Sequence, residues 1–332
     1  MPQPRAAHSA SLLRDGRVLL AGGCHTNGCE EGISGDALLF DPRMKTFTST
    51  GSLVQPRVGH RALRLRNDQV VLIGGWTADD ASDVVEAYDP TSGRFVRQGK
   101  LLHARDGFSA TPLADGNILV AGGYSGAMRR LASVEVYDPR TGKSHDAGAM
   151  STPRMSHTAT LLADGRVLIA GGSSARGILL DSIELFDPAT GRFMPAGHLQ
   201  KARHKHAALR VGNDVLLIGG AGVDEASQQY RDSERWSARD ASTRPGPAMQ
   251  DGRYKFLDAV VRLRDGRFLV AGSGRIPELL DSRAARFTSG DGSLGTDLSF
   301  TTATPLLDGS VLIAGGYGPD IHPSRSAWLY QP

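Results

Sequence analysis

Apolar residues in this chain gather in short runs that each end in a pair of glycines. The first run is Val18–Ala21, followed by Gly22-Gly23. Gly272-Ser273 is a degraded copy of the pair, and the other intact copies are Gly74-Gly75, Gly122-Gly123, Gly171-Gly172, Gly219-Gly220 and Gly315-Gly316. Successive first glycines are 52, 48, 49, 48, 53 and 43 residues apart. A period of this size predicts an array of equal supersecondary units.

Each repeat carries the pattern of four antiparallel strands. In the fourth repeat, apolar runs at 157–162 and 167–170 flank Asp164-Gly165, a pair that tolerates the positive φ of a tight hairpin turn. A third run precedes Asp187-Pro188, and a fourth short strand begins at Arg192 after a second turn. The glycine pair lets the backbone leave the sheet where a Cβ would clash. Four antiparallel strands per repeat make one propeller blade.

The repeat resembles a known family. The glycine pair is followed by a Glu-x-Tyr/Phe-Asp-Pro strand, as in 135–139 and 184–188, and then by an aromatic residue in strand four, such as Phe193. This pattern resembles the Kelch repeat and covers almost the whole chain. The resemblance implies an all-β, seven-bladed propeller around an axial channel, related in fold to the central domain of galactose oxidase, with residues 1–332 forming one domain. Local departures occur at Trp236, Ser273 and Trp328.

The two ends of the chain predict how the last blade closes. Met1–Arg5 aligns with Leu53–Arg57, which follows a fourth strand, and 326–332 aligns with a third strand. The last blade is therefore either three-stranded or completed by residues upstream of Met1. We expect the termini to lie side by side, with blade seven closed by the short N-terminal segment at most.

Composition excludes several function classes. The net charge is +3 and no basic run interleaves with aromatic residues, which argues against nucleic-acid binding. No apolar run is long enough to predict a membrane span or membrane insertion. The N-terminal residues lack an apolar signal region, which predicts a cytoplasmic location for the chain as it stands. A secreted or periplasmic location follows instead if a signal peptide was removed.

The first candidate site is a ring of residues at the start of strand one. It contains Arg5, Arg57, Arg105, Arg154 and Arg203, and three residues after the arginines His8, His60, His157 and His206, with Phe108 in the third repeat. The histidines could bind a divalent transition metal, and the arginines an anionic ligand. A structural role is the alternative we favour. Arginines would then pair with glutamates between neighbouring blades, and the histidines would cap backbone carbonyls. The glutamates are Glu86, Glu135, Glu184, Glu234 and Glu278.

Residues that directly follow the glycine pairs break the repeat. Trp76, Tyr124 and Tyr317 could form an aromatic wall of a ligand pocket at the channel mouth, or each could pack over its own blade. The first of these loops holds both cysteines, Cys24 and Cys29. They could form a disulfide in an oxidising compartment, bind a metal with His25 and Glu30, or supply a reactive thiolate. We favour the disulfide if the protein is exported and free thiols if it is not.

The sixth repeat has the most deviant first strand. Alignment backward from Asp265-Gly266 places Lys255 and Asp258 at the arginine and histidine positions, after Tyr254. A Lys–Asp pair in the channel mouth could do general acid–base work or be a surface ion pair. The same alignment places Leu298 and Thr301 at these positions in the seventh repeat.

These residues favour a binding protein over an enzyme. The leading hypothesis is that the channel mouth binds a small anionic or aromatic ligand or a partner peptide, through Trp76, Tyr124, Tyr254, Tyr317 and the arginines. The alternative is an isomerase, cyclase or lyase acting at the same mouth through His157, His206, Lys255 and Asp258, with or without a metal. A third hypothesis is a scaffold with an empty mouth. Galactose-oxidase-like enzymes are Kelch propellers that need a further domain for a copper ligand, and we expect no such domain in this chain.

Overall fold

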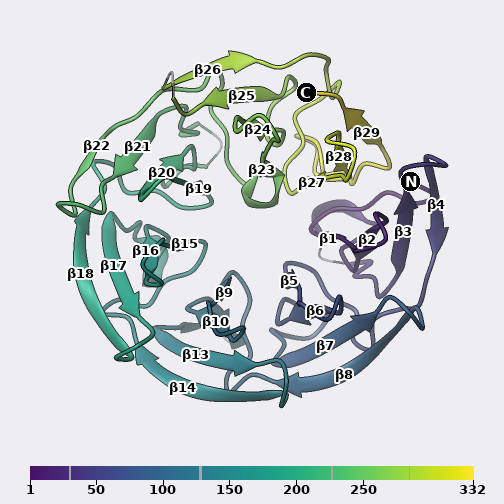
Figure 1. The fold of residues 1–332 in the computed structure, drawn as a ribbon, viewed down its shortest axis with the longest axis horizontal. Helices are drawn as coiled ribbons and strands as arrows, with labels where there is room; N and C mark the ends of the chain where they lie inside the picture. The colour runs from purple at the N-terminus through teal and green to yellow at the C-terminus, as the bar shows by residue number, and fades with distance from the viewer. Residues whose placement is uncertain (30, 127–128, 226, 284) are drawn as a thin grey trace.

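Seven small antiparallel sheets surround a central axis and confirm the predicted all-β, seven-bladed propeller (Figure 1). The computed structural model describes residues 1–332 except 30, 127–128, 226 and 284. In each blade the first strand lies nearest the axis, and in blades one to six the fourth lies at the rim.

Strands run outward from the axis in chain order. Blade one contains β1 (Ser9–Leu12), β2 (Val18–Ala21), β3 (Ala37–Asp41) and β4 (Thr46–Ser49). Blade two contains β5 (Arg61–Arg64), β6 (Val70–Ile73), β7 (Val84–Asp89) and β8 (Arg94–Lys100). Blade three contains β9 (Ser109–Pro112), β10 (Ile118–Ala121), β13 (Ser133–Asp138) and β14 (Lys143–Ala149), and carries a two-stranded ribbon of β11 (Tyr124–Ser125) and β12 (Arg129–Arg130).

The remaining blades follow the same order. Blade four contains β15 (Thr158–Leu161), β16 (Val167–Ala170), β17 (Ser182–Asp187) and β18 (Arg192–His198). Blade five contains β19 (Ala207–Val211), β20 (Asp214–Ile218), β21 (Ser233–Trp236) and β22 (Thr243–Pro245). Blade six contains β23 (Val260–Arg262), β24 (Phe268–Val270), β25 (Glu278–Asp281) and β26 (Arg286–Ser289), and blade seven β27 (Thr302–Pro305), β28 (Val311–Ala314) and β29 (Ala327–Tyr330).

The hydrophobic core lies between the blades. All four residues of β16 are buried, as expected for a strand covered on both faces. Leu119 of blade three packs in one cluster with Val167 and Phe186 of blade four. Each blade therefore depends on its neighbours for burial, as in other repeat architectures.

The glycine pairs allow this close approach. Gly122 has a φ of +65°, and a Cβ there would lie 2.5 Å from the carbonyl oxygen of Arg154 and 2.8 Å from Cε1 of His157. The N–H of Gly123 donates a 2.8 Å hydrogen bond to the same carbonyl. The first glycine thus makes room for the next blade, and the second bonds to it.

The termini meet, as predicted. The amino group of Met1 donates to the carbonyl of Arg325 at 2.6 Å, and the N–H of Arg5 donates to the carbonyl of Ser324 at 2.9 Å. Figure 1 shows the two ends in neighbouring blades, with β29 between them. Blade seven has three strands, β27, β28 and β29. Among the described residues, no helix has the length and apolar character needed to cross a membrane.

Blade six contains an insertion that corrects the sequence alignment. Gly266 follows Arg253 by thirteen positions, whereas Gly165 follows Arg154 by eleven. The two-residue insertion is accommodated by a three-residue 3-10 turn, Leu257–Ala259, ahead of β23. The arginine position is therefore held by Arg253, which bonds Glu278, and the ring position by Phe256, which packs against Gly219. Assigning Lys255 and Asp258 to these positions was wrong.

Candidate functional site

Buried arginine–glutamate pairs hold five blades together. Each arginine is fully buried and donates both to a glutamate and to the carbonyl of the first glycine of its repeat's glycine pair. Arg154, for example, donates to Glu184 and to Gly171. The pairs lie within one repeat, not between neighbouring blades as predicted. Their closest N–O distances are 2.5 Å for Arg57–Glu86, 2.6 Å for Arg105–Glu135, 2.7 Å for Arg154–Glu184 and Arg203–Glu234, and 2.9 Å for Arg253–Glu278. None of these arginines lines the mouth cavity described below.

The four ring histidines link neighbouring blades. Each Nε2 contacts a hydroxyl of the preceding blade, instead of the carbonyl that we expected. The pairs are His8–Thr302 at 3.1 Å, His60–Ser9 at 2.8 Å, His157–Ser109 at 2.9 Å and His206–Thr158 at 2.9 Å. Burial lowers the pKa of His8 to about 3 and holds the pKa values of the other three well below the usual range. The rings are therefore neutral at physiological pH.

These histidines do not converge on one point. Within the described part of the chain, no group of three or more His, Cys, Asp or Glu side chains is arranged to hold a metal ion. The donor set therefore does not fit a copper or zinc centre.

A second ring of residues surrounds the channel mouth. These residues lie two positions after the arginine, or after its counterpart Leu298, and all have a φ between 52° and 66°. Their backbones form a partial belt from blade to blade, as where Lys205 N–H donates to Ser156 at 2.9 Å and Lys255 N–H donates to Lys205 at 3.1 Å. The mouth ring comprises Ala7, Gly59, Gly107, Ser156, Lys205, Lys255 and Phe300. Non-glycine residues in this conformation are uncommon and often mark functional sites.

The mouth ring is asymmetric. It lines a cavity of about 300 Å³. Blades one to four contribute small residues, from Ala7 to Ser156, whereas blades five to seven contribute Lys205, Lys255 and Phe300. One side of the mouth is therefore open, and the other carries charge and aromatic surface.

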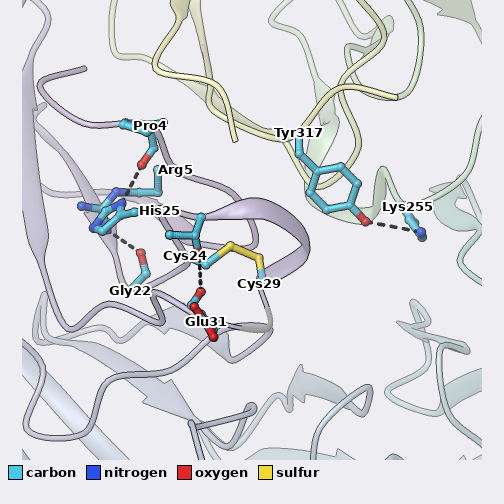
Figure 2. Close-up of a disulfide and its surroundings, with 10 residues drawn as sticks. Pro4, Arg5, Gly22, Cys24, His25, Cys29, Glu31, Lys255 and Tyr317 are labelled. Carbon is cyan, nitrogen blue, oxygen red and sulfur yellow. Dashed lines mark hydrogen bonds between the residues drawn. A yellow bond between two sulfur atoms is a disulfide. The ribbon is translucent and has the colours of Figure 1, made fainter. Parts of the chain in front are cut away.

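Lys255 is surrounded by three aromatic rings. Its Nζ lies 4.8 Å from the ring centre of Tyr254 and 5.8 Å from those of Phe300 and Tyr317. It donates to the Tyr317 hydroxyl at 3.3 Å, a contact visible in Figure 2. Burial disfavours its charge, but the two phenols and Glu225 outweigh that effect and raise the pKa of Lys255. Lys255 therefore presents a charged ammonium at the cavity wall.

Glu225 bridges the two lysines. Its carboxylate lies 2.5 Å from Lys205 Nζ, 3.4 Å from Lys255 Nζ and 3.3 Å from His204 Nε2. Burial lowers the pKa of His204 to about 4, so this imidazole is neutral. Two ammonium groups thus share one carboxylate, and this side of the mouth has one surplus positive charge.

Asp106 faces the same cavity from blade three. Burial raises its pKa to about 6, although the Gly107 N–H and the Tyr124 hydroxyl donate to its carboxylate. A Cβ on Gly59 would lie 2.6 Å from Asp106 Oδ1, so a side chain there would displace the Asp106 carboxylate. The Tyr124 ring lies 5.4 Å from that of Trp76, which lies outside the cavity lining. The predicted aromatic wall thus reaches the cavity at Tyr124 and Tyr317.

Asp258 and Lys255 line one cavity but have different partners. Arg61 of β5 donates to Asp258 of the inserted turn at 3.3 Å. Arg61, Asp258 and Leu257 also line a second cavity of about 350 Å³. This ion pair and the inserted turn thus lie where the two cavities adjoin.

Cys24 and Cys29 form a disulfide in the first loop (Figure 2). Cys29 lines the mouth cavity, and the Gly28 N–H donates to the carbonyl of Ile321 at 3.2 Å. His25 contacts the carbonyl of Pro4 at 2.6 Å and Asp36 at 3.3 Å, so its ring is engaged away from the sulfurs. Glu30, the fourth ligand considered for a metal, lies outside the described residues.

Comparisons with known proteins agree with this fold. The model of the Kelch motif matches residues 108–151, which span blade three. A solved structure described as a novel fungal alcohol oxidase of the AA5 family, in complex with copper, superposes with a TM-score of 0.77 at 15% identity, covering 99% of this chain and 75% of that chain. No curated protein sequence matches. The chain therefore carries a Kelch motif in a seven-bladed propeller, a fold that it shares with the propeller of galactose-oxidase-type enzymes.

Proposed function

We propose that this propeller binds a small aromatic anion at its channel mouth. The surplus positive charge shared by Lys205, Lys255 and Glu225 carries the proposal, because it lies at the wall of a cavity of about 300 Å³. Binding cavities of this size are typical for small molecules. The carboxylate of the ligand would accept a hydrogen bond from Lys255, and the aromatic ring of the ligand would lie between Tyr124 and Tyr317.

The partly open geometry suits ligand entry. Ala7, Gly59, Gly107 and Ser156 leave room opposite the lysines. A larger groove of about 710 Å³ lies beside the mouth and shares Lys255 and Tyr317 with it. This groove would accommodate the remainder of a longer ligand, such as a peptide with a terminal aromatic acid.

Calorimetric titration tests the proposal with phenylacetate and its neutral counterpart phenylacetamide as probes. A charged hydrogen bond contributes roughly 1.5–3 kcal/mol, so Lys255→Gln should weaken phenylacetate binding about 10- to 100-fold. Lys45→Gln is a matched control, because Lys45 is exposed and also has a positive φ of 53°. Equal affinity of wild type for the acid and the amide, or equal loss in both variants, would contradict the proposal.

Asp106 favours a second candidate, an enzyme that moves a proton at the same mouth. A carboxyl with a pKa of about 6 can accept and return a proton near neutral pH. The Asp106 carboxylate would act as the base, and Tyr124 would position it. Asp106→Asn should then retain a bound substrate but abolish its conversion, measured by mass spectrometry of the ligand after incubation. If Asp106→Asn lost both substrate binding and substrate conversion, Asp106 would be a binding residue and the proposed role as a base would be contradicted.

A further inference from the structure

Blade one lacks the carboxylate that its arginine needs. Leu38 lies opposite Leu20, at the register position where Glu86 lies opposite Leu72 in blade two. Arg5 is nonetheless retained and is only 1% exposed. Its Nη1 donates to the carbonyls of Gly22 and Asp36, as its counterparts do. In the described part of the chain, its Nη2 has no hydrogen-bond or ion-pair partner.

One backbone donor to the missing carboxylate also lacks a partner in the described part of the chain. Glu86 accepts hydrogen bonds from the N–H groups of Val54 and Gln55. The matching residues of blade one are Pro2, which has no N–H, and Gln3, whose N–H has no partner among the described residues. The site thus keeps two of the donors that bind a carboxylate elsewhere in the molecule.

Neighbouring groups do not replace the carboxylate. The side chain of Asp36 contacts His25 at 3.3 Å and forms no ion pair with Arg5, whereas the corresponding Asp232 of blade five bonds Arg203 at 2.9 Å. Burial lowers the pKa of Arg5 to about 10, so the group is still charged at neutral pH. The charge of Asp36 partly offsets this effect of burial on Arg5 but lies beyond ion-pair distance. A buried guanidinium with no carboxylate in direct contact is costly.

A cavity of about 180 Å³ lies beside Arg5. Its lining includes Pro2, Gln3, Asp36, Leu38 and the exposed Ser49 and Ser52. We propose that this cavity binds a short carboxylate anion, which takes the place of the absent glutamate. The anion would accept from Arg5 Nη2 and the Gln3 N–H, with the serine hydroxyls at its edge. This site is separate from the channel mouth and does not depend on the function proposed there.

Thermal unfolding in sodium formate and in sodium chloride at equal ionic strength tests this site. At about ten times its dissociation constant, formate should stabilise the protein by about 1.4 kcal/mol and raise the Tm relative to chloride by about 2 °C. Leu38→Glu should abolish the difference, because its own carboxylate fills the cavity. Lys255→Gln should keep the difference, which separates this site from the channel mouth. Leu307→Glu, at an exposed position outside the cavity, should also keep it.

Two outcomes would overturn the proposal. One is the same Tm in formate and chloride, and the other is a formate effect that survives in a folded Leu38→Glu protein. If that variant does not fold, a crystal structure of the wild type in formate decides the question. A formate ion bonded to Arg5 Nη2 supports the site, and water alone in that position refutes it.

Discussion

Replacing Glu135 by leucine tests whether the buried ion pairs hold the blades. Glu135 is 1% exposed and accepts from Arg105 Nη2 and from the Leu102 N–H, both at 2.6 Å. The change leaves a fully buried guanidinium without its partner, which costs about 3–5 kcal/mol. At about 2.1 cal/mol/K per residue, unfolding of 332 residues has an entropy of about 0.7 kcal/mol/K. The Tm should therefore fall by about 4–7 °C.

Calorimetric unfolding measures this shift against a surface control. Arg166 and Asp164 form an exposed pair at 2.7 Å, and such pairs contribute less than about 1 kcal/mol. Arg166→Gln should therefore lower the Tm by less than about 1.5 °C. Shifts of equal size in the two variants would refute the reasoning. In blade one, where Leu38 takes the place of the glutamate, a cavity lies beside Arg5, whereas none of the described cavities is lined by Arg105.

Three further changes test the glycine pairs, the buried histidines and the disulfide. Gly122→Ala should destabilise much more than Gly165→Ala in urea unfolding, since both have a positive φ but only Gly122 would clash, and equal losses would contradict the role of the glycine pair. His157 has a pKa well below the 6.5 of an unfolded histidine, so the unfolded chain binds the extra proton and stability falls as the pH drops below about 6.5. His157→Phe, which introduces the side chain that blade three carries at this position as Phe108, should reduce the loss between pH 7 and pH 5 by about 1–2 kcal/mol, and an unchanged pH slope would contradict the buried neutral ring. Reducing the disulfide, which closes a short loop, should lower the free energy of unfolding by about 2 kcal/mol. It should also weaken phenylacetate binding, because Cys29 lines the mouth cavity. Unchanged affinity would show that this loop does not contribute to the binding site.

Much of the fold was predictable because the glycine pairs recur for a steric reason. The neighbouring blade approaches Gly122 so closely that a Cβ would not fit. The same close approach recurs around the propeller, so the glycine pairs recur along the sequence at similar intervals. The same repetition indicated that Arg154 and Glu184 serve the structure. Periodic residues thus report on packing, and they reveal the architecture before any contact is known.

The candidate site was harder to predict because it departs from the period. The two-residue insertion at Leu257 hid the true register of blade six, so Lys255 was recognised as unusual but placed in the wrong ring. Asp106 was missed, although it is the only acidic residue directly following a blade arginine, where other blades have residues such as Ala6, Val58 and Met155. Glu225 lies in a variable loop, and no local pattern indicates that it reaches two lysines.

The most direct test of the proposed function is a crystal structure of the wild-type protein with phenylacetate. We expect the carboxylate within hydrogen-bond distance of Lys255 Nζ and the aromatic ring between Tyr124 and Tyr317, inside the mouth cavity. An empty mouth at saturating phenylacetate, or a probe bound only elsewhere on the propeller, would contradict it.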